Sequence, residues 1–207
     1  MIVDLLQLIC NYCHLNEQVK ITQINSVMNN NIKIYELYDI PYNLRKKITQ
    51  KVIEQKCFSK LEKLYAGYET KINNINHLAD TLLELNCYYK SEIDQEGIKN
   101  LKILQKLSVN DNPKIYNVDH LANTLIALHC QCDSAIDQNG IKNLKKLRTL
   151  NVENNGKIHD VNHLSETLTE LYCGYYCGLE EEGICKLKSL KKISTFNNPN
   201  LRHYVHK

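Results

Sequence analysis

Cysteine and histidine residues in this 207-residue chain have types and spacings that could hold haem or zinc. Cys10-Asn-Tyr-Cys13-His14 matches the c-type haem attachment string, and Cys130 and Cys132 are two closely spaced thiols of the kind that ligate zinc. The haem string lies within the apolar spacing of an amphipathic helix, and no export signal is visible. A second Cys-x-x-Cys pair that would complete a zinc site is missing. We therefore expect neither a cofactor nor a bound metal.

Histidines that could act in catalysis occur in copies rather than singly. His77, His120 and His163 lie 43 residues apart, each in the same position of a repeated motif that begins as Asn-His-Leu-Ala-Asp-Thr-Leu. A catalytic residue is needed only once, so a histidine present in every copy is better explained as holding a turn. No Gly-rich phosphate loop, nucleophile elbow or His-Glu-x-x-His string is present. We expect a protein that is not an enzyme.

The elements that position these residues follow from the same period, which contains two units. An aliphatic residue recurs at steps of 21 or 22 residues, with a small or medium residue two positions later and another aliphatic residue eight positions later. This ladder consists of Leu64, Leu85, Leu107, Leu128, Leu150, Leu171 and Ile193. Each apolar-x-apolar step predicts a short strand that buries one face, and the apolar run that follows predicts a helical turn on the outer side. Such units bury their apolar edges only by stacking.

The pattern resembles the leucine-rich repeat over residues 57 to 205. Alternate units, such as Ile93-Asp-Gln-Glu-Gly-Ile-x-x-Leu101, resemble the cysteine-containing repeats of F-box proteins. The cysteine position of that subtype, five residues after the strand leucine, instead holds Lys90, Asp133 and Tyr176. In the other units the same position carries an asparagine able to bond loop backbone: Asn112, Asn155 and Asn198. The resemblance implies an α/β leucine-rich-repeat solenoid with seven short parallel strands on a concave face.

Residues 1–56 lack the ladder and are expected to form a small helical module before the repeat domain, residues 57–207. Amphipathic spacing predicts two helices between Leu5 and Val27, and a third that begins near Pro41 and places Ile48 and Val52 on one face. The first two resemble a divergent F-box, although the usual Leu-Pro opening and the later Trp are absent. The alternative is a cap that covers the first repeat.

The F-box resemblance implies a Skp-type ubiquitin-ligase adaptor as a partner of the N-terminal helices. The docking residues that it implies are Leu5, Leu6, Ile9, Leu15, Val19 and Ile24. The Asn-, Ile- and Lys-rich composition is also similar to that of repeat proteins from large amoeba-infecting viruses.

Side chains that flank the buried strand positions are expected to point out from the concave face. This face is polar in the middle, with tyrosines towards both ends, and Tyr, Asn and His are typical of contact surfaces. We expect it to bind a target protein. The residues expected to contact that protein are Tyr65, Tyr68, Asn86, Tyr88, Asn110, His129, Gln131, Asn151, Glu153, Tyr172, Tyr175 and Phe196.

Composition argues against several other classes of partner. The net charge is +3 and the longest basic clusters are short, which speaks against a nucleic-acid surface. No apolar stretch approaches the ~18 residues of a membrane span. The chain has nine cysteines, an odd number, and it is too long to need disulfides, which indicates reduced thiols. We therefore expect the protein to lie in the cytoplasm, which for a viral protein would be that of the host cell.

These patterns predict a protein–protein interaction module, and the resemblance implies a substrate receptor of a cullin-type ubiquitin ligase. Such a receptor would hold a target on its concave face and present it to the charged enzyme by proximity. The alternative is a non-enzymatic scaffold whose N-terminal helices only cap the solenoid.

Overall fold

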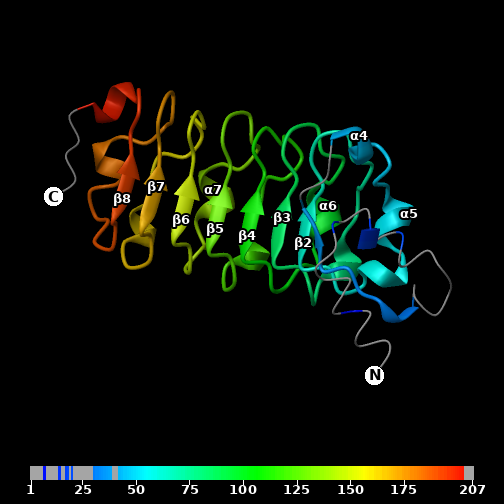
Figure 1. Ribbon diagram of the computed structural model, residues 1–207. Helices are drawn as coiled ribbons and strands as arrows, with labels where there is room; N and C mark the ends of the chain where they lie inside the picture. The colour runs from blue at the N-terminus through cyan, green and yellow to red at the C-terminus, as the bar shows by residue number, and fades with distance from the viewer. Residues whose placement is uncertain are drawn as a thin grey trace.

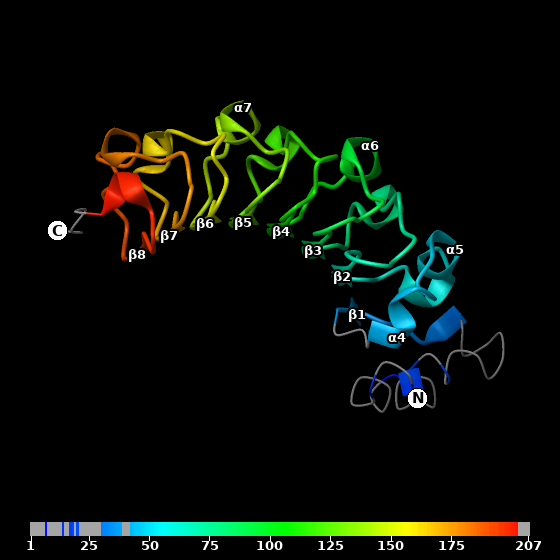
Figure 2. The same ribbon diagram turned by 90° about the horizontal axis from the view of Figure 1, so that it is seen from above.

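A computed structural model describes residues 7, 14, 17, 18, 20, 30–38 and 42–202 of the chain. These residues build one parallel sheet of eight strands, in which the spatial order of the strands is their order along the chain. Figure 1 shows the strands side by side. In Figure 2 they line the inner side of an arc, and the short helices lie along its outer side. Eight strands at about 4.8 Å spacing give this inner face a length of about 34 Å.

Short strands alternate with single helical turns throughout the described chain. The strands are β1 (Glu36–Leu37), β2 (Lys63–Tyr65), β3 (Glu84–Asn86), β4 (Lys106–Ser108), β5 (Ala127–His129), β6 (Thr149–Asn151), β7 (Glu170–Tyr172) and β8 (Lys192–Ser194). The α-helices are α4 (Tyr42–Arg45), α5 (Gln50–Ile53), α6 (Gln95–Ile98) and α7 (Gln138–Ile141). The 3-10 turns are η1 (Lys56–Phe58), η2 (Asn76–Leu78), η3 (Asp119–Leu121), η4 (Asn162–Leu164), η5 (Glu181–Gly183) and η6 (Pro199–Leu201).

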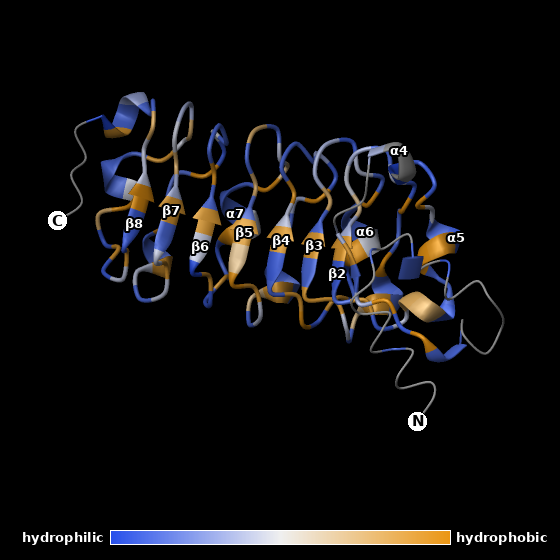
Figure 3. Cartoon of the chain, viewed as in Figure 1, coloured by the Kyte–Doolittle hydropathy of each residue, from blue (hydrophilic) through white to orange (hydrophobic). Residues whose placement is uncertain are grey.

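The aliphatic ladder is the central row of the sheet. Each ladder residue is the middle residue of its strand, and in the register Leu107 lies between Leu85 and Leu128. The ladder leucines are at most 2% exposed, because their side chains point into the space between the sheet and the outer turns. Figure 3 shows the result in β3, where a hydrophobic centre separates two hydrophilic ends. The predicted α/β architecture is confirmed.

The sheet has one strand more than the seven predicted. β1 pairs with β2 and places Leu37 beside Leu64. Leu37 is fully buried, as are Ile32 and Ile34 just before it. The ladder spacing does not reveal this strand, since the step from Leu37 to Leu64 is 27 residues. Part of the region expected to be helical therefore continues the sheet.

The third predicted N-terminal helix is wrong in its extent. It is broken into α4 and α5, because the backbone at Ile48 and Thr49 pairs with Lys71. The Lys71 amide donates to the Ile48 carbonyl at 2.9 Å, and the Gln50 amide donates to the Lys71 carbonyl at 2.8 Å. Ile48 and Val52 pack against the core as expected. This segment thereby joins the first repeat instead of standing apart from it.

The six residues predicted to dock an adaptor, together with Cys10 and Cys13, lie outside the described residues. Gln7 is described, and its amide holds both backbone groups of Lys33. It donates to the Lys33 carbonyl at 2.9 Å and accepts from the Lys33 amide at 2.6 Å. The start of the chain thus contacts the segment that leads into β1.

A buried asparagine stabilises the loops that follow β4, β6 and β8. Asn155 Nδ2 donates to the carbonyls of Cys130 and Ile136, and Asn155 Oδ1 accepts from the Lys157 amide. Asn112 and Asn198 make equivalent contacts to neighbouring loops. This confirms the role expected for the asparagines.

In the alternate units the buried loop position lies six residues after the leucine, not five. Ser91, Ser134 and Cys177 are buried there, and Ser91 Oγ donates to the Ala66 carbonyl at 2.7 Å. The residues one position earlier, Lys90 and Asp133, are exposed. The buried loop position of these units is therefore one residue later than the position predicted for it, and in the third unit it holds Cys177.

The repeated histidines hold turns, as their repetition indicated. His120 Nε2 donates to the Ile98 carbonyl and His163 Nε2 to the Ile141 carbonyl, both at 3.1 Å. His77 bonds Ile53 in the same way at 3.3 Å. Partial burial lowers the pKa of His120, so its imidazole is neutral near pH 7.

Candidate functional site

Three rows of side chains cross the concave face. The first row is formed by the first residue of each strand, the second row by the last residue, and the third row by the residue two positions beyond. From β2 to β8 the second row reads Tyr65, Asn86, Ser108, His129, Asn151, Tyr172 and Ser194. The third row reads Gly67, Tyr88, Asn110, Gln131, Glu153, Gly174 and Phe196. Because the strands are in register, side chains in one row are neighbours.

Tyrosine rings gather at the β2 end of the face. The rings of Tyr65 and Tyr88 meet edge to face at 5.7 Å, with their hydroxyls 3.3 Å apart. Tyr68 packs between Tyr42 and Tyr89, with centroids 6.2 Å and 5.4 Å away. We call these five residues the N-terminal tyrosine cluster.

Burial divides the cluster into a support and a contact surface. Tyr65 is only 6% exposed, and the Arg45 guanidinium lies 4.6 Å from its ring centre. Burial raises the pKa of Tyr65, which keeps its hydroxyl protonated. Tyr42 and Tyr89 remain exposed. Tyr65, expected as a contact residue, thus mainly supports the rings around it.

The third row forms a hydrogen-bonded chain in the middle of the sheet. Asn110 Nδ2 donates to Gln131 Oε1 at 2.7 Å, and Gln131 Nε2 donates to Glu153 Oε2 at 2.8 Å. Asn110 Oδ1 also accepts a hydrogen bond from the backbone N–H of Gln131, and Asn151 Oδ1 accepts one from the backbone N–H of Glu153. These bonds fix the side chains in place, so ordering them would add little entropic cost on binding.

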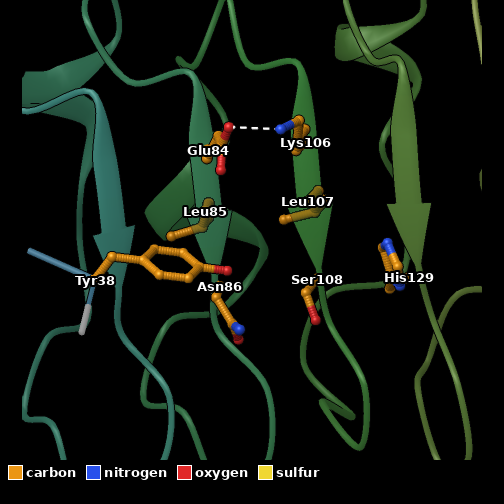
Figure 4. Close-up of a pocket in the computed structure, with 8 residues that line it drawn as sticks. All are labelled: Tyr38, Glu84, Leu85, Asn86, Lys106, Leu107, Ser108 and His129. Carbon is orange, nitrogen blue, oxygen red and sulfur yellow. Dashed lines mark hydrogen bonds and ion pairs between the residues drawn. The ribbon is translucent and has the colours of Figure 1, made fainter. Parts of the chain in front are cut away.

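A pocket of about 240 Å³ opens over β3, β4 and β5, beside the hydrogen-bonded side chains of the third row. Figure 4 shows the Glu84–Lys106 ion pair at one end, with Ser108 and His129 at the other and the Tyr38 ring across the β3 side. Burial lowers the pKa of His129, so its ring is neutral and able both to donate and to accept a hydrogen bond. The pocket is therefore suited to uncharged polar groups.

Tyr38 and Ser108 are pocket residues that the sequence did not single out. Tyr38 follows β1, the strand that the ladder did not reveal, so nothing in the spacing marked it. Ser108 lies in the second row beside Asn86 and His129, and its position could have been taken from the register.

The β8 end of the face carries a second aromatic group. Tyr175 and Phe196 meet edge to face at 5.6 Å, and Phe196 is 61% exposed. Tyr172 Oη donates to Glu170 at 3.1 Å, and the Lys192 ammonium lies 5.0 Å from the Tyr172 ring centre. The expected contact residues thus form three groups on one face: aromatic, polar and aromatic.

Of the two cysteines considered as zinc ligands, Cys130 belongs to the core, whereas Cys132 is only partly buried. Cys130 and its equivalent in the next copy, Cys173, are fully buried at the inward position two residues after the ladder leucine. Burial raises the pKa of each of these thiols and brings that of Cys177 to about 11. Within the described part of the chain, no cluster of three or more His, Cys, Asp or Glu residues could hold a metal ion. Nor does any helix among the described residues have the length and apolarity to span a membrane.

Comparison with known proteins identifies the architecture. No protein-family model matches the sequence, and no curated protein matches it. Among solved structures, an internalin from Listeria monocytogenes superposes with a TM-score of 0.50 and 22% sequence identity, over 67% of this chain. The chain spans 43% of the length of that internalin.

The fold is a leucine-rich-repeat solenoid. Two findings support this assignment: the eight parallel strands lie in chain order, and the chain superposes on an internalin. At this level of identity the likeness concerns the fold alone, and the function of the solenoid must be inferred from its own surface.

Proposed function

We propose that this leucine-rich-repeat solenoid binds a protein partner through its concave face and acts by holding that partner rather than by catalysis. The observation that carries the proposal is the pocket over β3 to β5, which lies next to fixed polar side chains and between two aromatic groups. Aromatic rings supply contact area at low entropic cost, and preorganised polar groups supply specificity.

The dimensions of the face agree with an extended peptide segment or a protein surface as the ligand. Its length of about 34 Å would accommodate roughly ten residues of extended chain at about 3.3 Å each. The side chains of Ser108 and neutral His129 offer donors and acceptors to a peptide backbone or to amide side chains. Neither side chain has a hydrogen bond that is seen among the described residues.

Selection from a library of displayed random peptides tests this proposal, because it samples many ligand sequences at once. Peptides that bind the wild type should bind a Ser108→Arg variant at least about tenfold more weakly, because the new side chain would fill the pocket and bring in a charge. Affinity would be measured by fluorescence anisotropy with synthetic versions of the selected peptides.

The matched control is Asn139→Arg, which places the same side chain on the exposed outer helix α7. It should bind the selected peptides as the wild type does, and circular dichroism should show both variants folded. Peptides that tolerate Ser108→Arg, or that lose affinity for Asn139→Arg, would show that binding lies elsewhere.

The finer proposal is that the N-terminal helices dock a Skp-type adaptor in the cytoplasm, which would make the solenoid a ubiquitin-ligase substrate receptor. It is supported only by the F-box resemblance, since the residues concerned lie outside the described part of the chain. A titration with a eukaryotic Skp-type adaptor should show saturable binding that folded Leu6→Asp and Ile9→Asp variants lose. A wild type that does not bind leaves the cap as the function of these helices.

Burial of Ile34 and Leu37 in the core shared with the first repeat favours the cap for residues 30–38. A cap and an adaptor-binding surface are compatible, because the predicted docking residues precede this segment.

A further inference from the structure

Charged side chains form a ladder of ion pairs along the edge of the sheet where the strands begin, the lower edge in Figure 1. The three 43-residue copies are those that contain His77, His120 and His163. In the first copy, Lys102 pairs with Asp80 at 3.4 Å and Lys106 pairs with Glu84 at 2.7 Å. Each pair joins one unit to the next, so that lysines and acids alternate from strand to strand.

The third copy keeps both acids and both lysines of this ladder. Lys188 pairs with Glu166 at 3.0 Å, and the proximity of Lys188 lowers the pKa of Glu166. Lys192 and Glu170 are neighbours in the register of β7 and β8. Copies one and three therefore balance their charges in the same way.

The middle copy departs from this pattern at both acidic positions and at the second lysine, which is replaced by Thr149. Asn123 stands where the other copies have Asp80 and Glu166, and Ala127 stands where they have Glu84 and Glu170. The first lysine is kept as Lys145, but the acid that would pair with it is gone.

The same copy also carries additional positive charge. Lys146 and Arg148 stand where the first copy has Ile103 and Gln105. Lys145, Lys146 and Arg148, with Lys142 just before them, are all exposed. No ion pair to any of these four is seen among the described residues. We call these four residues the basic edge.

Backbone contacts show that the basic edge has the same geometry as its counterparts. The Lys145 amide donates to the Ala122 carbonyl at 3.4 Å, as Lys102 does to Ala79 at 3.3 Å. The Arg148 amide donates to Ile126, the residue before Ala127, at 2.8 Å. The backbone of the middle copy is therefore arranged as in the first copy, and the two copies differ here in the side chains that they present.

A surface pocket of about 470 Å³ continues the basic edge towards β8. Arg148, Lys188 and Lys191 line it together with the hydroxyl-bearing residues Thr167, Thr169 and Ser189. Ammonium, guanidinium and hydroxyl groups are donors suited to carboxylates. One acid, Glu166, also lines this pocket, and it is already paired with Lys188.

We propose that the basic edge and the adjoining pocket bind an acidic segment of a partner protein, rich in Asp or Glu. Lys102 and Lys106 of the first copy and Lys188 of the third are paired with acids, whereas no such pair is seen for the basic edge among the described residues, which leaves its cations available for a carboxylate from outside. This surface is separate from the concave pocket, so the proposal does not depend on the outcome of the peptide selection.

The double variant Asn123→Asp/Ala127→Glu tests the proposal by restoring the acids of copies one and three. It should remain folded, because the neighbouring copies carry acids at both positions. A fluorescein-labelled oligo-glutamate peptide should bind the wild type with an affinity that falls with added salt. It should bind the double variant at least about tenfold more weakly, since the acid introduced at position 123 would pair with Lys145 and the acid introduced at position 127 would add a second negative charge to the same edge.

Lys47→Glu is the matched control, because it changes the net charge by the same two units at the opposite end of the sheet. It should bind the peptide as the wild type does, and an oligo-glutamine peptide should not bind. Equal binding by the double variant and the wild type would overturn the proposal, as would an equal loss in Lys47→Glu. A single-stranded oligonucleotide that bound more tightly than oligo-glutamate would also overturn it and assign the edge to nucleic acid.

Discussion

Gly140→Ala is expected to lower the free energy of unfolding by about 2–4 kcal/mol. A Cβ atom at this position would lie 2.5 Å from the carbonyl oxygen of Tyr116, in the preceding unit. The obstacle is backbone and cannot rotate away, so α7 or the loop before it would have to shift. Gly97 and Gly183 meet the same obstacle at Asn73 and His159.

The measurement is urea denaturation followed by circular dichroism, with Gly156→Ala as the control. At Gly156 a Cβ would meet only one atom, at the ordinary distance of 3.7 Å. The control variant should therefore be within about 0.5 kcal/mol of the wild type. Equal stability of the two variants would show that the units are not packed as closely as the structure has them.

Asn155→Ala is expected to cost about 3 kcal/mol, because the side chain is fully buried and serves three backbone groups. Its removal would leave the carbonyls of Cys130 and Ile136 and the amide of Lys157 without this partner. The bonds to the two carbonyls are buried, so the cost of desolvating these carbonyls would not be recovered. Asn155→Asp should be nearly as harmful, since a carboxylate cannot donate to the two carbonyls.

Asn139→Ala is the control for this pair, because Asn139 is exposed on α7 and no side-chain hydrogen bond is seen for it among the described residues. It should unfold with the wild type or slightly later, given the better helix propensity of alanine. Native-state hydrogen exchange should place the loss of protection in Asn155→Ala around β5, β6 and the loops between them. A loss spread evenly over the sheet would contradict a local role for this side chain.

The sequence was sufficient to predict the solenoid, because the residues that repeat are aliphatic and must be buried. Leu85, Leu107 and their equivalents recur at steps that only stacked strands explain, and the register places them side by side. The histidine turns and the asparagine contacts were predictable for the same reason, since each copy repeats them.

What the sequence did not predict lies where the period fails or where charge and burial depend on neighbours. Leu37 stands at an irregular distance from Leu64, so its strand was missed, and Tyr38 with it. Tyr65 was placed on the correct face, but its burial depends on Arg45, a residue from outside the ladder. The contact residues of the concave face remain predictions until a ligand is found.

In the sheet, each strand pairs with the strand that follows it in the chain. A gene that duplicates one 43-residue copy would thus add two strands, about 9.6 Å of new surface, without altering any existing junction. Evolution can lengthen such a protein in whole increments, and outward side chains can diverge while inward ones are kept. The exchange of Asp80 and Glu84 for Asn123 and Ala127 between copies is divergence of this kind, within a single molecule.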